Sequence, residues 1–154
     1  MVWEVYLGLG GNIGDSKSRI QKAFKILNSH PRIEKAELSP IIQTDPVSDL
    51  PQEKFQNAVC KIITNLLPVE LFSLTEEIEK LLGKVPKAKN APRKIDIDLL
   101  LYGNLKGQFG PLSIPHPEWL NRSFVLQPLA MLTDTIPIPG SEIEQERMNV
   151  PKIS

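Results

Sequence analysis

The succession of extended and helical segments is the feature that most constrains the fold of this chain. Residues 2–10 alternate apolar and other side chains like a strand, and apolar side chains recur every three or four positions over 16–30 and 68–82, as on amphipathic helices. Residues 33–44, 55–65 and 95–103 have the composition of extended segments. This β-α-β-β-α-β order and the right-handed crossover rule predict one antiparallel sheet with both helices on one face, a ferredoxin-like two-layer α+β sandwich.

The rest of the chain adds a C-terminal extension to this plan. Pro40 interrupts the segment 33–44, so we expect that segment at a sheet edge. A long loop over 103–122, a helix over 123–133 that contains Pro128, and a proline-rich tail over 134–154 follow. Because the 154 residues contain no internal repeat and no linker, the sequence predicts a single domain over residues 1–154.

Charge and cysteine content narrow the classes of function. Lys plus Arg and Asp plus Glu both number 18, so the formal net charge is zero, and we expect no nucleic-acid partner and no membrane partner. No apolar run is long enough to span a bilayer. The single cysteine, Cys60, excludes an internal disulfide and no basic leader precedes the first strand, so we expect a cytoplasmic protein. We also expect a monomer, with a weak dimer as the alternative.

Two acidic residues lie inside the most apolar extended segment. A buried carboxylate without a partner is costly, yet Asp96 and Asp98 interrupt a run of aliphatic side chains. Residues i and i+2 of a strand point to one face, with Cα atoms about 6.6 Å apart, so both carboxylates address the same region. Three interpretations are open. The pair could lie on a solvated face, or form ion pairs with Arg93 and Lys94. It could also bind Mg²⁺, which favours oxygen ligands.

The surroundings of the pair favour the metal. A solvated face conflicts with Leu100 and Tyr102, which the alternation places on the same face as buried residues. Bridging carboxylates can hold two metal ions about 3.5–4 Å apart. Cations beside such a pair suit a polyphosphate. A basic loop that contains Lys84, Lys87, Lys89 and Arg93 leads directly into the pair.

Two other groups are candidates for a site. His116 and Arg122 lie in a proline-rich loop, and both would bind phosphate if that loop folds over the acid pair. The alternatives are a structural role for His116 and an ion pair between Arg122 and Glu118. Phe55 and Asn57 share a strand face beside 44–46 and suit a flat heterocycle, or form ordinary core.

The glycines of LGLGGNIGD, residues 7–15, lack the spacing of a dinucleotide or phosphate loop. We interpret them as a tight turn, at whose tip Asn12 is able to contact a ligand.

These motifs together resemble the 6-hydroxymethyl-7,8-dihydropterin pyrophosphokinase family of folate biosynthesis, over roughly residues 2–140. The family signature is a basic residue, any residue, Gly or Ala, and then P-R-x-x-D-apolar-D-apolar-apolar, and KNAPRKIDIDLL (89–100) matches it. LGLGGNIGD, QTDPV (43–47), FQNAV and IPHPEWLNRSFVLQPL are similar to the family's other conserved stretches.

The resemblance implies an Mg-dependent enzyme that moves pyrophosphate from ATP to the pterin hydroxymethyl group and releases AMP. Asp96 and Asp98 would hold two Mg²⁺ ions and act in catalysis with Arg93, while Phe55 and Phe124 would stack on the pterin. The implied ATP-binding residues are Glu79, Lys84, Arg93, Ser113, His116 and Arg122. The implied pterin-binding residues are Thr44, Pro46, Val47, Phe55, Asn57 and Phe124.

The sequence also departs from the family. Lys84 and Pro86 stand where the enterobacterial form has two loop arginines, and KAKNAPR has no aromatic residue in place of its tryptophan. Because lysine is a point charge, we expect a weaker grip on ATP than a bidentate arginine gives. An RNA-binding or regulatory module with the same fold, and a nucleotidyl transferase or cyclase that uses a D-x-D metal pair, are the rival interpretations.

Overall fold

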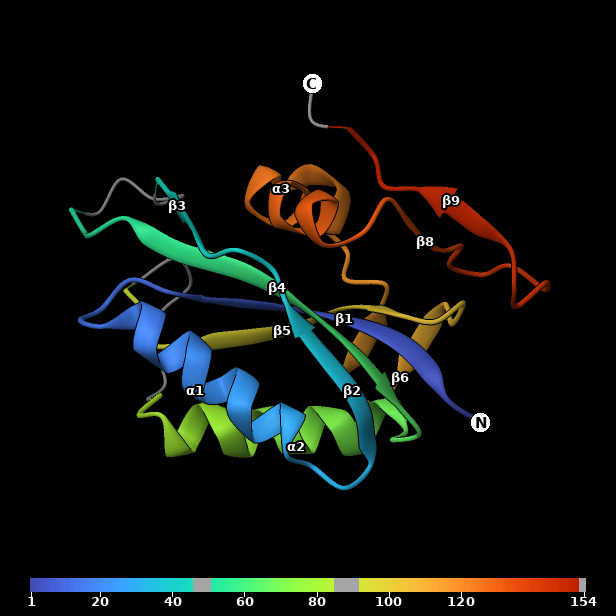
Figure 1. Ribbon diagram of the computed structural model, residues 1–154, viewed down its shortest axis with the longest axis horizontal. Coiled ribbons are helices and arrows are strands. Elements are labelled where there is room, and N and C mark those ends of the chain that lie inside the picture. The colour runs from blue at the N-terminus through green and yellow to red at the C-terminus, as the bar shows by residue number, and fades with distance from the viewer. Residues whose placement is uncertain (46–50, 85–91, 153–154) are drawn as a thin grey trace.

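The computed structural model describes residues 1–45, 51–84 and 92–152 and has an α+β architecture built around one antiparallel sheet (Figure 1). The first strand begins at residue 3 and the last ends at residue 149. The elements are β1 (Trp3–Gly11), α1 (Ser16–Asn28), β2 (Ile33–Leu38), β3 (Ile42–Thr44), β4 (Phe55–Thr64), α2 (Pro68–Leu81), β5 (Asp96–Tyr102), β6 (Gly107–Phe109), β7 (Leu112–Ile114), a 3-10 helix (Trp119–Asn121), α3 (Ser123–Leu132), β8 (Thr135–Pro137) and β9 (Arg147–Asn149).

The strands of the main sheet follow the order β2-β4-β1-β5, and β3 also pairs with β4. Every one of these pairings is antiparallel. β1 and β4 are therefore central, while β2 and β5 lie at the two edges of the described sheet. Helices α1 and α2 lie on one face of this sheet and α3 lies on the other (Figure 1).

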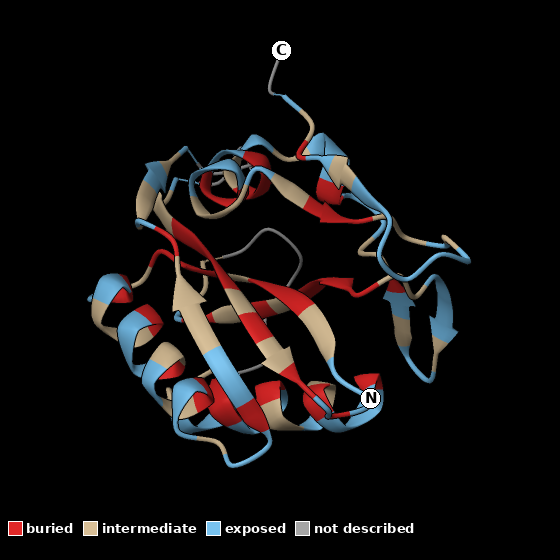
Figure 2. Ribbon diagram, turned by 45° about the vertical axis from the view of Figure 1, so that its right-hand side comes forward, coloured by how far each residue is buried: buried red, intermediate tan, exposed pale blue. Residues whose placement is uncertain are grey.

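The alternation along the strands divides the apolar residues between the two faces. Val5, Leu7 and Leu9 of β1 pack with α1 and α2, whereas Tyr6 belongs to the cluster under α3. Buried residues accordingly follow the central strands and the inner sides of the helices (Figure 2). The predicted C-terminal helix is thus confirmed, but it forms a third layer that the two-layer expectation did not include.

The segment 33–44 is interrupted as predicted. β2 ends at Leu38 and β3 begins at Ile42, with Pro40 between them, and both strands pair with β4. Ser39 maintains the connection to β4, because its backbone N–H donates to the Val59 carbonyl and its hydroxyl accepts from the Val59 N–H, both at 2.9 Å. β2 lies at the sheet edge, where a neighbouring proline removes no ladder hydrogen bond.

A β-bulge in β5 overturns one expectation. Tyr6 pairs with Leu101 and Leu7 pairs with Leu99, so Leu100 is an extra residue on β5. Leu100 and Leu101 both face α3, while Tyr102 turns to the helical layer, where its hydroxyl donates to the Leu66 carbonyl. The prediction that Tyr102 shares a face with Leu100 is therefore wrong, because simple alternation does not continue through a bulge.

The C-terminal half contains two hairpins that we did not predict. β6 and β7 pair within the expected loop over 103–122, and β8 and β9 pair within the tail. Arg147 of β9 bonds the carboxylate of Glu4 on β1 at 2.9 Å through each of two nitrogens, which holds the tail against the sheet. In the described ranges, no helix has the length and apolar character needed to cross a membrane.

Candidate active site

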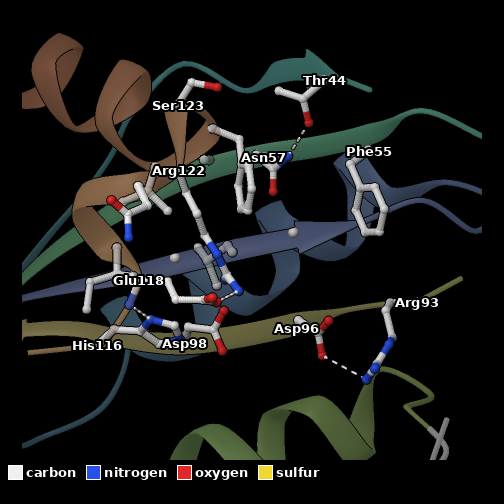
Figure 3. Close-up of a pocket in the computed structure, with 18 of the residues that line it drawn as sticks. Thr44, Phe55, Asn57, Arg93, Asp96, Asp98, His116, Glu118, Arg122 and Ser123 are labelled. Carbon is white, nitrogen blue, oxygen red and sulfur yellow. Dashed lines mark hydrogen bonds and ion pairs between the residues drawn. The ribbon is translucent and has the colours of Figure 1, made fainter. Parts of the chain in front are cut away.

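A cavity of about 780 Å³ lies on the α3 side of the sheet. Strands β1, β3, β4 and β5 contribute residues to its wall, and so does the segment 116–125 (Figure 3). Most of the predicted site residues that the structure describes meet here. Those that line the cavity are Thr44, Phe55, Asn57, Lys84, Arg93, Asp96, Asp98, His116, Arg122 and Phe124.

Two glycines of β1 allow neighbouring segments to pack closely against this strand. A Cβ atom on Gly10 would lie 2.5 Å from Asn57 Oδ1, and one on Gly11 would lie 2.4 Å from the Lys94 carbonyl oxygen. Both contacts are far shorter than van der Waals separation, so Gly11 excludes a side chain because it meets backbone, whereas a side chain at Gly10 would force the Asn57 amide to move. The glycines thus serve close packing within the strand, and the expected turn begins only after Gly11.

Asn12 follows β1, and its side chain is hydrogen-bonded to other segments of the protein. Its Oδ1 accepts from the Arg93 N–H at 2.8 Å, and its Nδ2 donates to Gln52 Oε1 at 2.7 Å and to the Glu53 carbonyl at 3.0 Å. The Asn12 N–H also donates to the Arg93 carbonyl at 2.8 Å. Asn12 therefore positions the segment that leads into β5, in place of the ligand contact suggested by its place in the turn.

Asp96 and Asp98 both point into the cavity from β5 (Figure 3). Asp96 Oδ1 lies 2.8 Å from Lys84 Nζ and 3.7 Å from an Arg93 guanidinium nitrogen. Burial raises the pKa of Asp98; the charges of His116 and Arg122 oppose this rise and the Asp96 charge adds to it. The face thus carries one ion-paired carboxylate and one desolvated carboxylate, which a cation would stabilise.

Glu79 supports the acid pair from the helical side. This residue of α2 is 7% exposed, and its Oε2 accepts from the Ile97 N–H at 2.8 Å and from Lys84 Nζ at 2.9 Å. Burial raises the pKa of Glu79, although these two hydrogen bonds counteract the rise. Because β5 is an edge strand, the Ile97 N–H has no strand partner, and Glu79 accepts its hydrogen bond instead. Glu79 itself is not among the residues that line the cavity.

His116 and Arg122 line the cavity beside Asp98 (Figure 3). The His116 N–H donates to the carbonyl of Leu100, the bulge residue, at 2.8 Å. Arg122 pairs with Glu118 at 2.5 Å and lies over the Phe124 ring, 5.4 Å from its centroid. The Arg122–Glu118 pair, one of the alternatives raised by the sequence, therefore exists, and it leaves the guanidinium in the cavity wall.

The far end of the cavity is aromatic and amide-lined. Phe55 pairs with Thr44 across β3 and β4, and the Asn57 amide donates to the Thr44 hydroxyl at 2.7 Å. This bond holds the Asn57 side chain in place, and no described residue donates a hydrogen bond to its Oδ1. Phe124 lines the cavity from α3.

Some predicted residues do not join the cavity. Ser113 lies on the exposed β6–β7 hairpin, where its hydroxyl donates to Gln108 Oε1 at 2.9 Å. Pro46, Val47, Pro86, Lys87 and Lys89 lie outside the described residues.

Four polar lining residues were not predicted as ligand contacts: Asp45, Glu118, Asn121 and Ser123. The spacing of Glu118 four residues before Arg122 was a usable signal, whereas the other three have no distinctive pattern.

Comparison with known proteins bears on what this cavity binds. Residues 6–134 match the family model described as 7,8-dihydro-6-hydroxymethylpterin-pyrophosphokinase. A 2-amino-4-hydroxy-6-hydroxymethyldihydropteridine pyrophosphokinase of Bacillus subtilis is 36% identical over 145 residues, which cover 94% of this chain and 87% of that protein. One of the same description from Pseudomonas aeruginosa is 33% identical over 139 residues, 90% of this chain and 86% of that protein.

A longer relative shares the same region. The bifunctional protein FolKE of Lactococcus lactis is 40% identical over 129 residues, which are 84% of this chain but only 37% of that protein. The match to the family model spans the acid pair, the arginines and the aromatic residues of the cavity. This chain belongs to the 7,8-dihydro-6-hydroxymethylpterin-pyrophosphokinase family.

Proposed function

We propose that this chain transfers pyrophosphate from ATP to the hydroxymethyl group of 6-hydroxymethyl-7,8-dihydropterin, giving the pterin diphosphate and AMP in folate biosynthesis. One observation carries the proposal. The wall of a single cavity carries an acid pair surrounded by cations and also two phenylalanines and an amide held in place by Thr44. The first set of residues suits a nucleotide polyphosphate and the second suits a flat heterocycle, which are the two substrates of this reaction.

The acid pair fits Mg²⁺. Within the described residues, no group of three or more His, Cys, Asp or Glu side chains has the arrangement of a metal cage. Mg²⁺ does not require one, because it usually takes one or two carboxylates and completes its shell with water and substrate phosphates. We assign Asp96 and Asp98 as its ligands, two ions per site, and the bound ions would supply charge neutralisation across the phosphates.

The remaining charged residues act on the phosphates. Arg93, His116 and Arg122 bind phosphate oxygens and stabilise the charge that develops as the hydroxymethyl oxygen attacks the β-phosphorus in line and AMP leaves. Arginine suits this role because its guanidinium can bind two oxygens at once. We assign no general base, since positioning and charge stabilisation account for most of the catalysis in phosphoryl transfer.

The aromatic end binds the pterin. Phe55 and Phe124 stack on its two faces, and Asn57 hydrogen-bonds its edge while Thr44 holds the Asn57 amide in place. We extend the pocket to Pro46 and Val47 on the basis of the sequence resemblance. Ser113 lies outside the cavity, so a nucleotide contact there requires ATP to extend beyond the described lining residues.

The finer fold assignment and the setting of the protein are part of the same proposal. The order β2-β4-β1-β5, with two helices on one face, supports a ferredoxin-like core with a C-terminal extension. We propose that the protein works as a monomer in the cytoplasm, with ATP and the pterin as its small-molecule partners.

Nucleotide chromatography tests the function directly. The protein is incubated with Mg-ATP, with and without the hydroxymethyl dihydropterin, and the nucleotides are separated. AMP that forms only with the pterin supports the proposal. Release of pyrophosphate from ATP would support a nucleotidyl transferase or cyclase, and the absence of turnover would support a binding module; either result contradicts the proposal.

A further inference from the structure

Lys84 joins acidic side chains from two different elements. Its Nζ lies 2.8 Å from Asp96 Oδ1 on β5 and 2.9 Å from Glu79 Oε2 on α2. The Glu79 side chain is 9% exposed and that of Asp96 is 31% exposed, so the bridge runs from the protein interior to the cavity wall. Burial alone would lower the pKa of Lys84, but its hydrogen bonds to the two acids raise it, which fixes the side chain as a cation.

The bridge occupies the same carboxylate that the metal needs. Asp96 Oδ1 is the atom that Lys84 contacts, and Arg93 approaches that oxygen to 3.7 Å. By contrast, Asp98 takes part in no ion pair with another described residue within 4.0 Å. A divalent cation could therefore reach Asp98 directly, but it would meet an ammonium group already bound at Asp96.

We infer that Lys84 is an internal competitor of the divalent cation, bound to Asp96 in the ligand-free protein and displaced from it when the metal binds. This inference rests on the proposed binding of Mg²⁺ by the acid pair. Two cations at contact distance from one carboxylate oxygen repel each other strongly, so a metal ion that binds Asp96 Oδ1 favours the departure of Lys84 from it.

Glu79 determines where the displaced ammonium goes. Its carboxylate is fixed by the Ile97 N–H and contacts Lys84 independently of Asp96. Lys84 therefore remains tethered beside the acid pair, where its charge is available to a phosphate oxygen brought in with the metal. Glu79 is thus a positioning residue for Lys84. Metal binding without nucleotide is weakened by the competition, and nucleotide phosphate removes part of that penalty by accepting the ammonium.

Mn²⁺ binding without nucleotide, followed by the electron paramagnetic resonance signal of the free ion, tests the competition. We expect Lys84→Met to bind Mn²⁺ roughly 5- to 50-fold more tightly than the unaltered protein, the usual size of coupling between two ligands. Lys84→Arg, which keeps the charge, should stay close to the unaltered protein. Lys80→Met, at an exposed lysine near the end of α2, is the matched control and should change nothing.

A double variant separates competition from net charge. Glu79→Gln/Lys84→Met removes one negative and one positive charge, so the local net charge is that of the unaltered protein, and the glutamine oxygen can still accept from the Ile97 N–H. Competition predicts that the double variant retains the tight Mn²⁺ binding of Lys84→Met. If its affinity returns to that of the unaltered protein, general electrostatics explains the effect and the inference is wrong.

A direct observation of the ammonium completes the test. The ¹⁵N resonance of Lys84 Nζ, assigned by its loss in Lys84→Arg, should move when Mg²⁺ alone is added. A protein that turns over Mg-ATP and the pterin, but whose Mn²⁺ affinity does not depend on Lys84, would overturn this inference alone. Absence of turnover, together with Mn²⁺ binding that Asp98→Asn leaves unchanged, would overturn the proposed function.

Discussion

Arg147 on β9 donates two hydrogen bonds of 2.9 Å to the carboxylate of Glu4 on β1, across 143 positions of sequence. The Tyr6 hydroxyl also donates to this carboxylate, and the Arg147 guanidinium bonds the hydroxyl and carbonyl of Thr135 on β8. The C-terminal hairpin is therefore fixed to the central strand by a charged network rather than by apolar packing alone.

Removal of this guanidinium should destabilise the fold without affecting the cavity. For Arg147→Met we expect the free energy of unfolding to fall by about 1–2 kcal/mol, because a partly buried carboxylate loses charged hydrogen bonds. Urea unfolding followed by circular dichroism measures the change. Lys152→Met, at an exposed residue of the same tail, should leave the midpoint in place, and an equal shift in both variants would contradict the assignment.

The same network predicts a pH dependence. Burial alone would raise the pKa of Glu4, but hydrogen bonds from Arg147 and Tyr6 outweigh it and lower the pKa below 4.5. A lowered pKa means that the unfolded chain binds the proton more readily, so this contribution is present above about pH 4.5 and is lost as pH falls through the folded value. The stability difference between the unaltered protein and Arg147→Met should therefore shrink between pH 5 and pH 3, as urea midpoints measured across that range would show.

We expect Asp98 to lower the stability of the ligand-free protein and, at the same time, to be required for turnover. Its pKa is raised by burial, so the ligand-free protein loses stability as pH rises from the unfolded to the folded pKa of this group. At neutral pH we expect Asp98→Asn to unfold at an equal or higher urea concentration, yet to react more slowly by roughly 10³-fold or more, since it loses a metal ligand. Asp134→Asn, at an exposed residue, should change neither quantity. A turnover rate of Asp98→Asn near that of the unaltered protein would refute the metal assignment.

The two phenylalanines of the cavity should not respond alike to truncation. Both line the cavity, but among the described residues it is Phe124 that carries a cation, the Arg122 guanidinium, 5.4 Å from its ring centroid. We expect Phe55→Ala to raise the KM for the pterin about tenfold and leave the KM for ATP unchanged. Phe124→Ala should raise both, because Arg122 loses its support. Steady-state kinetics with each substrate varied in turn measures the four values, and a pure pterin effect in both variants would contradict the role of Arg122.

The central fold was predictable because its signals are local. The amphipathic stripes of α1 and α2 and the alternation in β1 and β4 identify their elements without reference to the rest of the chain. The bulge at Leu100 was not predictable, because an extra residue in a strand depends on the register with its neighbour. The two short hairpins, β6–β7 and β8–β9, have only three residues in each strand, too few for a recognisable period.

The site could be predicted where residue chemistry is unusual for its setting. Two aspartates in an aliphatic strand pointed to the acid pair, and Phe55 beside Asn57 pointed to the second end of the cavity. The bridge from Lys84 to both Glu79 and Asp96 could not be predicted, since it depends on how α2 packs beside β5. Likewise, only tertiary structure brings Asn12 to Arg93, a residue 81 positions away.

The bond between Glu79 and the outward N–H of Ile97 has a consequence for the behaviour of the protein at high concentration. An exposed edge strand presents unpaired N–H and C=O groups with which a strand of a second molecule can pair. Here the Glu79 carboxylate from α2 already accepts the amide hydrogen of Ile97, in the middle of this edge. A second strand would have to break this bond to pair along β5, so the bond disfavours edge-to-edge pairing at the strand that carries the two aspartates.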